Sequence, residues 1–428
     1  MMRSPSDTPR VLAIAEAANP DWVSVPLVGW SLAHALRARA EVHLVTQSRN
    51  REAILKAGYV EGQDVTFIDS EAFARPLWKL GEWLRMGQGK GWTMVQALNA
   101  IAYPHFERLV WQQFGERIAA GEWDIVHRIT PLSPTIASPI AARIAKTGTP
   151  FLLGPLNGGV PWPDEFDSER RAEREYLSYV RNAYKALPGR KATLKHASAV
   201  LCGSRHTASE MPESCAHKVV YLPENGIDPA RFNATVKPRS GLLRAAFVGR
   251  LVPYKGADML LAAAEPLIER GAIQIDIIGD GPMRHALEEQ AGGSECVTFH
   301  GWLEHREVQN VLRDAHILAF PSIREFGGGV VLEAMALGVP AMVVDYAGPG
   351  ELVTPETGIK VPLSSRAGII KGFRTELRRL AEDPSQLAPM AMAAQARVQQ
   401  DFTWARKAEQ VAQVYDAILT GRALPSVF

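Results

Sequence analysis

One stretch in the second half of the chain decides the fold: Ala245-Ala246-Phe247-Val248-Gly249-Arg250-Leu251-Val252-Pro253-Tyr254-Lys255-Gly256. Its first residues form an apolar run that predicts a buried strand, and Gly249 predicts a tight turn after that strand. Residues Asp258 to Arg270 predict a helix. A strand that leads through a glycine turn into a helix is the first half of a βαβ unit, the unit from which parallel sheets are built.

The same alternation continues on both sides of this stretch. Toward the C-terminus we expect strands at 273–278, 297–299, 317–321 and 341–344, with helices up to Gln290 and from Val330 to Leu337. Toward the N-terminus we expect strands at 11–15, 42–46, 124–127, 151–154 and 199–202, with a loop at 20–29 and a helix from about 31 to 39. Short apolar runs separated by helices indicate parallel sheets that are buried on both faces.

The length of 428 residues exceeds what one hydrophobic core usually supports, so we expect two domains. A proline-punctuated stretch from Asp228 to Pro238 interrupts the alternation and is the candidate linker. We therefore predict an α/β fold of two Rossmann-like domains, with the boundary between residues 230 and 231.

Composition excludes several classes of protein. Lys plus Arg number 47 against 46 for Asp plus Glu, and this balance argues against a nucleic-acid partner. The three cysteines show no Cys-x-x-Cys spacing, which argues against a structural zinc site or a disulfide framework and suits a reducing cytoplasm. The apolar run at 11–18 is too short for a signal peptide, and no run reaches the ~18 apolar residues expected of a membrane-spanning helix.

Two cations bracket the loop that follows Gly249. Arg250 and Lys255 stand five residues apart, between a glycine turn and the start of a helix. Glycine lets the backbone approach a phosphate, while the helix N-terminus and the two cations neutralise its charge. A departing nucleoside diphosphate needs such groups, because negative charge grows on its oxygen as the glycosidic bond breaks. The alternative is a solvated Arg and Lys on a strand-end loop.

A second motif carries a pair of carboxylates: Ser322-Ile323-Arg324-Glu325-Phe326-Gly327-Gly328-Gly329-Val330-Val331-Leu332-Glu333. Three consecutive glycines at a helix entrance present backbone N–H groups to a ligand. Carboxylates accept hydrogen bonds from neighbouring hydroxyls, so Glu325 and Glu333 suit a sugar and a ribose. Alternatively, Glu325 is an exposed loop carboxylate and Glu333 an ordinary charge in a first helical turn.

These motifs resemble family 4 of the retaining glycosyltransferases, which have the GT-B fold. The resemblance spans roughly residues 200–355. Its motifs are Phe247-Val248-Gly249-Arg250-Leu251 with Lys255-Gly256, Ile278-Gly279-Asp280-Gly281-Pro282, Pro321-Ser322 with Glu325 and Glu333-Ala334-Met335-Ala336-Leu337-Gly338-Val339-Pro340, and Pro223-Glu224-Asn225-Gly226-Ile227-Asp228. The N-terminal half resembles the family in architecture more than in motif.

The resemblance implies a role for each matching residue. Arg250 and Lys255 hold the donor diphosphate beside the motif glycines Gly249, Gly279 and Gly281. Glu325 and the backbone of Phe326-Gly327-Gly328 meet the donor sugar, Glu333 binds the ribose hydroxyls, and Gly301-Trp302 lies along the nucleobase. The family more often shows Glu-Gly-Phe-Gly, so Phe326 is a departure, although the spacing between the two glutamates is kept.

Four residues of the first half complete the candidate site. His127 ends a predicted strand and matches a family histidine near the reacting sugar; the alternative is a hydrogen-bonded structural histidine. Gly29 matches a family glycine loop, and Gly158 and Gly159 form a further loop on the acceptor side or a simple turn. Eight of the ten tryptophans fall at or before Trp162, and they suit either sugar stacking or core packing.

A basic stretch runs from Arg170 to Lys195. It predicts either a solvated helix face or a face that meets anionic lipid heads or a lipid-pyrophosphate acceptor. The second alternative implies peripheral contact of the first domain with the inner face of the membrane.

Together these features predict a glycosyltransferase. The resemblance implies a retaining enzyme that moves a hexose-type sugar from a nucleotide diphosphate to a hydroxyl of a glycan or lipid-linked acceptor, in cell-surface polysaccharide or glycolipid synthesis. It also implies that the last helix, within 402–428, packs back on the N-terminal domain, and that the second domain is 231–401. The sequence has no Asp-x-Asp motif, so we expect neither metal nor cofactor.

Two alternatives remain open. A dinucleotide-dependent oxidoreductase would share the parallel α/β halves, but Gly279-Asp280-Gly281 is followed by Arg284 where the third glycine of its phosphate loop would stand. A catalytically inactive scaffold that binds sugar nucleotides would share the motifs themselves.

Overall fold

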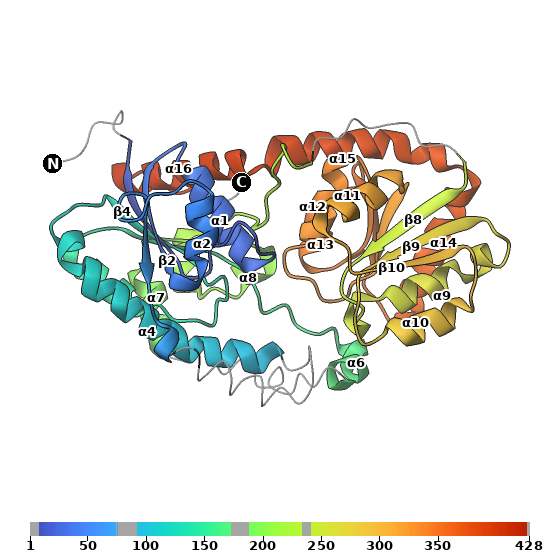
Figure 1. The fold of residues 1–428 in the computed structure, drawn as a ribbon, viewed down its shortest axis with the longest axis horizontal. Coiled ribbons are helices and arrows are strands. Elements are labelled where there is room, and N and C mark those ends of the chain that lie inside the picture. The colour runs from blue at the N-terminus through green and yellow to red at the C-terminus, as the bar shows by residue number, and fades with distance from the viewer. Residues whose placement is uncertain (1–7, 74, 76–91, 173–187, 233–240, 426–428) are drawn as a thin grey trace. The chain divides into compact units, whose positions relative to one another are not determined.

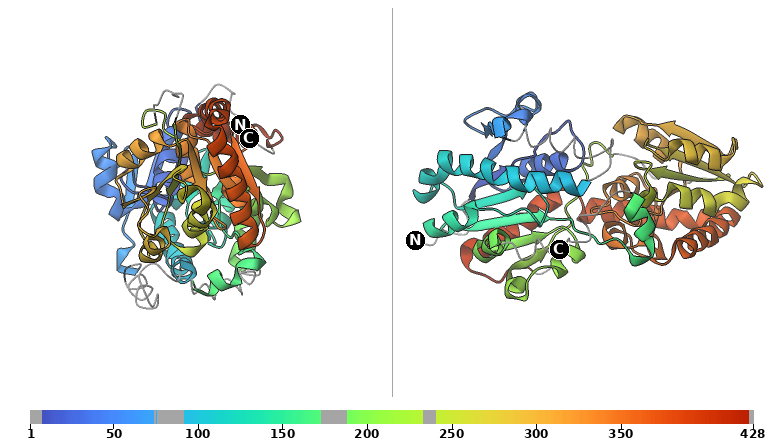
Figure 2. Two further views of the ribbon diagram at one scale, coloured as in Figure 1. Left: turned by 90° about the vertical axis from the view of Figure 1, so that its right-hand side faces the viewer. Right: turned by 90° about the horizontal axis from the view of Figure 1, so that it is seen from below.

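A computed structural model describes residues 8–73, 75, 92–172, 188–232 and 241–425 (Figure 1). It divides into two compact units, each built on one sheet. The first unit holds the described residues of 1–159, 173–224 and 404–428, and the second holds those of 160–172 and 225–403. The predicted α/β class is confirmed, because both sheets are wholly parallel and both are flanked by helices (Figure 2).

The first sheet has seven strands in the order β3-β2-β1-β4-β5-β6-β7. Its strands are β1 (Arg10–Ala15), β2 (Glu41–Gln47), β3 (Val65–Ile68), β4 (Ile125–Thr130), β5 (Phe151–Leu156), β6 (Ala199–Cys202) and β7 (Val219–Tyr221). Every strand expected in this half is present, and β4 extends three residues beyond its predicted end at His127. The short strands β3 and β7 escaped prediction.

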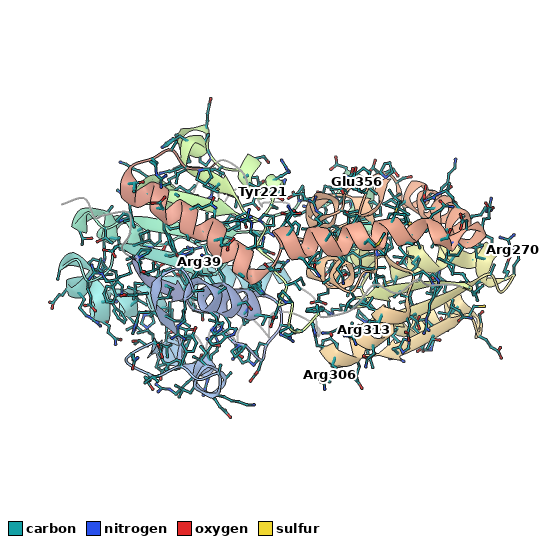
Figure 3. All side chains as sticks on the ribbon, turned by 90° about the horizontal axis from the view of Figure 1, so that it is seen from above. Arg39, Tyr221, Arg270, Arg306, Arg313 and Glu356 are labelled. Atoms are coloured by element: carbon teal, nitrogen blue, oxygen red, sulfur yellow. The ribbon has the colours of Figure 1, made fainter. Side chains whose placement is uncertain are left out.

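Alternate residues of β1 belong to two separate core layers. Val11 and Ala13 face one layer, while Leu12 and Ile14 face the other. Helices α1 (Val25–Leu36) and α16 (Trp404–Thr420) contribute to the first layer, and α4 (Trp92–Ala119) and α5 (Ile140–Ile144) to the second. The last helix therefore packs on the N-terminal sheet as expected, and Arg39 lies beside it, paired with Glu409 (Figure 3).

The second sheet has six strands in the order β10-β9-β8-β11-β12-β13. They are β8 (Leu243–Val248), β9 (Ile273–Ile278), β10 (Val297–Gly301), β11 (Ile317–Phe320), β12 (Ala341–Asp345) and β13 (Gly358–Pro362). The main helices of this unit are α9 (Ala257–Ile268), α10 (Arg284–Ala291), α11 (His305–Asp314), α12 (Gly329–Ala336), α13 (Ala347–Leu352), α14 (Arg366–Glu382) and α15 (Leu387–Asp401).

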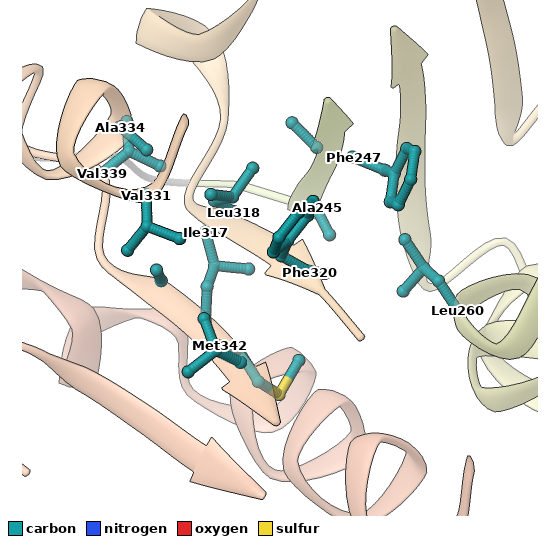
Figure 4. Packing of buried hydrophobic residues seen from close by; sticks show 14 of the residues in the cluster. Ala245, Phe247, Leu260, Ile317, Leu318, Phe320, Val331, Ala334, Val339 and Met342 are labelled. Atoms are coloured by element: carbon teal, nitrogen blue, oxygen red, sulfur yellow. The ribbon is translucent and has the colours of Figure 1, made fainter. Parts of the chain in front are cut away.

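One apolar core holds the second unit together (Figure 4). The rings of Phe247 on β8 and Phe320 on β11 lie 6.0 Å apart at its centre, with Leu260 of α9 and Met342 of β12 in the same cluster. Burying each such side chain contributes ~1.5–3 kcal/mol. The two strands that precede the candidate donor loops are therefore anchored in this core.

The segment 160–172 packs with the second unit, although the sequence placed it in the first domain. Trp162 and Phe166 are buried in the second unit's core, and α6 (Asp167–Ala172) follows them. This apolar pair explains the grouping, because its ring surface needs a partner that the polar neighbouring residues cannot supply. The predicted boundary at 230/231 stays a prediction, and much of the candidate linker (233–240) lies outside the described residues.

Strand order reverses at one point in each sheet, between β1 and β4 in the first and between β8 and β11 in the second. At such a point the loops after the two strands diverge, and the carboxyl ends of the strands leave room for a ligand. In the described part of the chain, no helix is both long and apolar enough to cross a membrane.

Candidate active site

The loop after β8 carries both predicted phosphate-binding cations. The chain leaves β8 at Val248, passes Gly249 and an exposed Arg250, and makes a 3-10 turn at Pro253–Lys255. Gly256, in the left-handed conformation (φ 79°), is the N-cap of α9, which begins at Ala257. Lys255 thus directly precedes the N-cap of α9, where the partial positive charge of the helix adds to its own.

Backbone hydrogen bonds join this loop to the end of β9. The N–H of Gly249 donates to the carbonyl of Ile278 (3.0 Å), and the N–H of Leu251 donates to that of Asp280 (2.9 Å). Gly279 has φ 132°, and a Cβ there would overlap the carbonyl oxygen of Gly249. Gly279 and Gly281 therefore let the two loops approach closely; their contact with a donor stays a prediction.

The loop after β11 carries the first glutamate. β11 ends at Phe320, Glu325 lies in the irregular segment that follows, and α12 begins at Gly329 behind Gly328 (φ 63°). Phe326 and Gly327 are half-buried between Glu325 and this helix. The predicted elements are thus confirmed: a strand, a glycine-rich loop and a helix whose first N–H groups lack partners within the helix.

Lys255 and Glu325 come together as an ion pair, although 70 residues separate them in sequence. Their side chains are 17% and 20% exposed. The loops that carry them are tied again one residue away, because the carbonyl of Tyr254 accepts hydrogen bonds from the N–H of Ile323 (3.0 Å) and the hydroxyl of Ser322 (3.3 Å). This contact joins the two loops of the β8/β11 reversal point.

The pair has the chemistry of a binding site. A lysine ammonium has three N–H donors and a carboxylate has two acceptor oxygens, so neither group is saturated by the other. The Lys255 nitrogen also lies 5.4 Å from the ring centre of Phe320, whose negative face favours a cation. Such a half-buried pair can receive a phosphate at the ammonium and a hydroxyl at the carboxylate.

Glu333, the second glutamate, has a partner that the sequence analysis missed. Nε2 of His305 lies 3.1 Å from its carboxylate, and Gln309 lies 3.4 Å from Nδ1 of the same ring. His305 is the first residue of α11, behind the capping pair formed by Glu304 and Glu307. The capping pattern could have located this helix start, but the pairing with Glu333 depends on tertiary structure.

The predicted base-side residues end β10. Gly301 closes the strand and Trp302 is 74% exposed just beyond it. Behind them, Nε2 of His300 lies 2.7 Å from the buried carboxylate of Asp276, which also pairs with Arg244. Burial raises the pKa of Asp276, but the hydrogen bonds from Arg244 and His300 outweigh it and lower that pKa overall.

His127 does not project toward a ligand, and this corrects the expectation. It lies within β4, fully buried, with Nε2 2.7 Å from the carbonyl of Gly154 and Nδ1 2.7 Å from the hydroxyl of Tyr415. A carbonyl only accepts, so Nε2 carries the proton and Nδ1 accepts from Tyr415. Burial lowers the pKa of His127 to about 4, so the ring is neutral and structural.

The predicted glycines on the acceptor side are placed differently from one another. Gly29 lies inside α1, not in a loop, because the helix begins at Val25 with a proline in its first turn. A Cβ on Gly29 would overlap the carbonyl oxygen of Ala17, so this glycine serves close packing. Gly158 and Gly159 do form a loop after β5, and their role toward an acceptor stays a prediction.

The basic stretch is divided between the two units. Arg170 and Arg171 of α6 belong to the second unit and pair with Asp167, whereas the described residues from 188 onward belong to the first. Arg190 on α7 (Pro188–His196) is buried. The described part is therefore shared between two units, and residues 173–187 lie outside the described residues.

Comparisons with known proteins agree on a family. The model of the family "Glycosyl transferases group 1" matches residues 243–383, which contain the β8 and β11 loops. Glycogen synthase from Mycobacterium tuberculosis is 34% identical over 213 residues (48% of this chain, 50% of the relative). A GDP-mannose-dependent phosphatidylinositol monomannoside mannosyltransferase from Corynebacterium glutamicum is 33% identical over 215 residues (45% and 55%). The matches thus span about half the length of these relatives.

Solved structures agree on the fold. HepE from Anabaena superposes with a TM-score of 0.59 at 16% identity, over 94% of this chain and 98% of that one. Sucrose-phosphate synthase from Thermosynechococcus elongatus gives 0.60 at 18% identity, over 96% and 100%. These likenesses confirm the predicted GT-B fold of two Rossmann-like domains. Residues 243–383 of this chain thus form a domain of the glycosyl transferases group 1 family.

Proposed function

We propose that this protein is a retaining glycosyltransferase that moves a hexose-type sugar from a nucleotide diphosphate donor to a hydroxyl of a glycan or lipid-linked acceptor. The observation that carries the proposal is the Lys255–Glu325 pair, which joins the two loops at the strand reversal of the family domain. Ligands of open parallel sheets bind at such reversals. An ammonium beside a carboxylate offers one group for the diphosphate and one for the sugar.

The proposed donor site divides the ligand among four side chains. Arg250 and Lys255 neutralise the diphosphate, Glu325 accepts hydrogen bonds from sugar hydroxyls, and Glu333, oriented by His305, accepts them from the ribose. Two solved structures of one relative support a nucleotide-sugar donor, since HepE was crystallised with UDP and glucose and, separately, with UDP-glucose. This division needs neither metal nor cofactor, because the two cations supply the positive charge.

In the proposed reaction the acceptor hydroxyl attacks the anomeric carbon from the side on which the diphosphate leaves. The new bond joins the acceptor oxygen to that carbon while the bond from the carbon to the diphosphate oxygen breaks. The proton of the hydroxyl passes to the departing oxygen, and the anomeric configuration is retained. Arg250 and Lys255 act most strongly at this moment, because charge on the leaving oxygen is then largest.

A glycan or lipid-linked acceptor fits the Corynebacterium glutamicum relative, which is named for its action on a phosphatidylinositol mannoside. It also fits a relative from Erwinia amylovora that is named for amylovoran biosynthesis and is 26% identical over 217 residues (48% of this chain, 52% of the relative). We therefore propose a role in cell-surface polysaccharide or glycolipid synthesis. A lipid-linked acceptor would bring the protein to the cytoplasmic face of the membrane.

A thermal-shift screen of UDP, GDP, ADP and dTDP sugars, followed by a donor hydrolysis assay, tests this function. One nucleotide sugar should raise the melting temperature, because a ligand that binds only the folded state stabilises it. The same donor should be hydrolysed slowly. Binding without hydrolysis or transfer would favour an inactive scaffold, and no shift with any nucleotide sugar would contradict the proposal.

A further inference from the structure

Trp162 is a large buried side chain that contacts the neighbours of Lys255 and Glu325 and to which the proposed function gives no role. It is 6% exposed and belongs to the core of the second unit. The segment that carries it enters this unit from the middle of the first unit's sequence, between residues 159 and 173.

The Trp162 ring touches both candidate donor loops. The ring of Tyr254, which precedes Lys255, meets it edge-on with centroids 5.8 Å apart and an angle of 86°. The guanidinium of Arg324, which precedes Glu325, lies 5.1 Å from its centre. Trp162 therefore contacts the sequence neighbour of each member of the ion pair.

Further contacts hold Trp162 in place. The hydroxyl of Tyr346 donates a 3.0 Å hydrogen bond to the carbonyl of Pro161, and Phe166 anchors the other end of the segment in the core. Arg324 also lies 5.6 Å from the ring centre of Phe326, the residue at which this chain departs from the commoner family pattern. Arg324 of the β11 loop thus lies near the faces of two aromatic rings, those of Trp162 and Phe326.

We propose that Trp162 is a positioning residue of the donor site: it holds the loops that carry Lys255 and Glu325 in register, and segment 160–172 is thereby part of that site. The inference rests on the proposed function. An aromatic face that receives an edge from one loop and a cation from the other fixes the distance between the two loops. Misplacing a binding group by ~1 Å can lower a reaction rate about 100-fold. Removing the Trp162 ring should therefore weaken donor binding by displacing Lys255 and Glu325, although the ring itself does not contact the donor.

The test compares the affinities of the wild type and Trp162→Ala for two ligands, UDP-glucose and UMP, by isothermal titration. If the wild type selects another base, the corresponding nucleotide sugar and monophosphate are used. UDP-glucose engages Lys255 and Glu325, whereas UMP lacks the sugar and the second phosphate. The Kd for UDP-glucose should rise about tenfold or more and that for UMP less than about twofold. Trp162→Phe, which keeps a ring and loses an indole N–H without a hydrogen-bond partner among the described residues, should restore most of the affinity.

Trp123 provides the matched control, since it too is 6% exposed but lies in the core of the first unit. Trp123→Ala should lower the melting temperature and leave both Kd values unchanged. If Trp162→Ala does not fold, Trp162→Leu fills most of the space without an aromatic face and should show the same selective loss. An equal change for both probes, or none, in the folded variant overturns the inference.

A double variant separates positioning from general destabilisation. Because Trp162 acts through Lys255, adding Trp162→Ala to Lys255→Ala should weaken UDP binding by less than about twofold further. A full additive loss contradicts the inference. If the wild type binds no nucleotide sugar, the proposed function itself fails; if it binds and Trp162→Ala binds equally well, only the positioning role fails.

Discussion

The two sheets share a wholly parallel order, yet the reversal points between their central strands are occupied differently. In the first unit, the hydroxyl of Thr130 at the end of β4 forms hydrogen bonds with the backbone N–H and carbonyl of Ala17 after β1 (both 3.1 Å). The buried His127 of the same strand is hydrogen-bonded to the hydroxyl of Tyr415. In the second, the half-buried Lys255 and Glu325 join the corresponding loops. The same topology therefore gives a packed junction in one unit and a charged junction in the other, so the side chains and not the strand order identify the candidate site.

The largest expected effect comes from removing the charged junction. Lys255→Ala and Glu325→Ala should each lower donor turnover about 100- to 1,000-fold, because each loses a group aimed at developing charge or at the sugar. Lys360→Ala is the matched control, since Lys360 of the same unit also pairs with a carboxylate, that of Asp345 at 3.0 Å. Steady-state hydrolysis of the donor measures all three, and an equal loss in Lys360→Ala would remove the special role of the junction.

The packed junction of the first unit should instead make the free energy of unfolding depend on pH, because it buries His127. Burial lowers the pKa of His127 to about 4 from its ordinary 6.5, so between these values the unfolded chain binds more protons than the folded one. Stability due to His127 is therefore complete above pH 6.5 and is lost as the pH falls through 4, by about 3 kcal/mol in total. Urea unfolding of the wild type and His127→Gln at pH 7 and pH 4 measures this. A difference between the two proteins that does not shrink at pH 4 would contradict the assignment.

The close approach of the loops after β8 and β9 can be tested with a glycine-to-alanine substitution, which adds one methyl group. Gly279→Ala should destabilise the second unit by about 2 kcal/mol more than Gly271→Ala does. Both glycines have positive φ, but a Cβ at 279 meets the carbonyl of Gly249, whereas one at 271 meets nothing. Equal losses in chemical denaturation would show that the β8 and β9 loops are not tightly packed.

The smallest effect concerns the orientation of Glu333. His305→Ala removes a 3.1 Å contact with that carboxylate and should weaken UMP binding about tenfold or less, without altering the ratio between UDP-glucose and UMP. A loss of affinity for UDP-glucose alone would contradict this role and would indicate that His305 supports binding of the sugar, not of the ribose.

Much of the second unit was predictable because local sequence and tertiary role agree there. The apolar runs before Gly249 and Ser322 are strands, and Lys255 and Glu325, which the resemblance assigns to one donor site, form an ion pair. Their contact with a donor stays a prediction. The first unit was less predictable. Pro26 and Gly29 suggested a loop, but proline is tolerated in the first turn of a helix and Gly29 is needed for close packing.

Other features depend on contacts between distant parts of the chain, which local patterns do not contain. His127 looked like a strand end, whereas β4 continues to Thr130 and buries the ring against a helix almost 300 residues later (288 to Tyr415). His305 meets Glu333, and Trp162 inserts between two loops, through tertiary packing alone. For these residues the sequence shows the residue type, but only the tertiary structure shows which residues they contact.

The most direct test of the charged junction is whether the protein distinguishes a nucleoside diphosphate from a monophosphate through Lys255. Isothermal titration of the wild type and Lys255→Ala with UDP and UMP, or the pair for the selected base, gives the ratio of the two Kd values. We predict that the wild type binds the diphosphate at least about tenfold more tightly than the monophosphate, and that Lys255→Ala loses this preference while its UMP affinity stays the same. An unchanged preference in Lys255→Ala would contradict it.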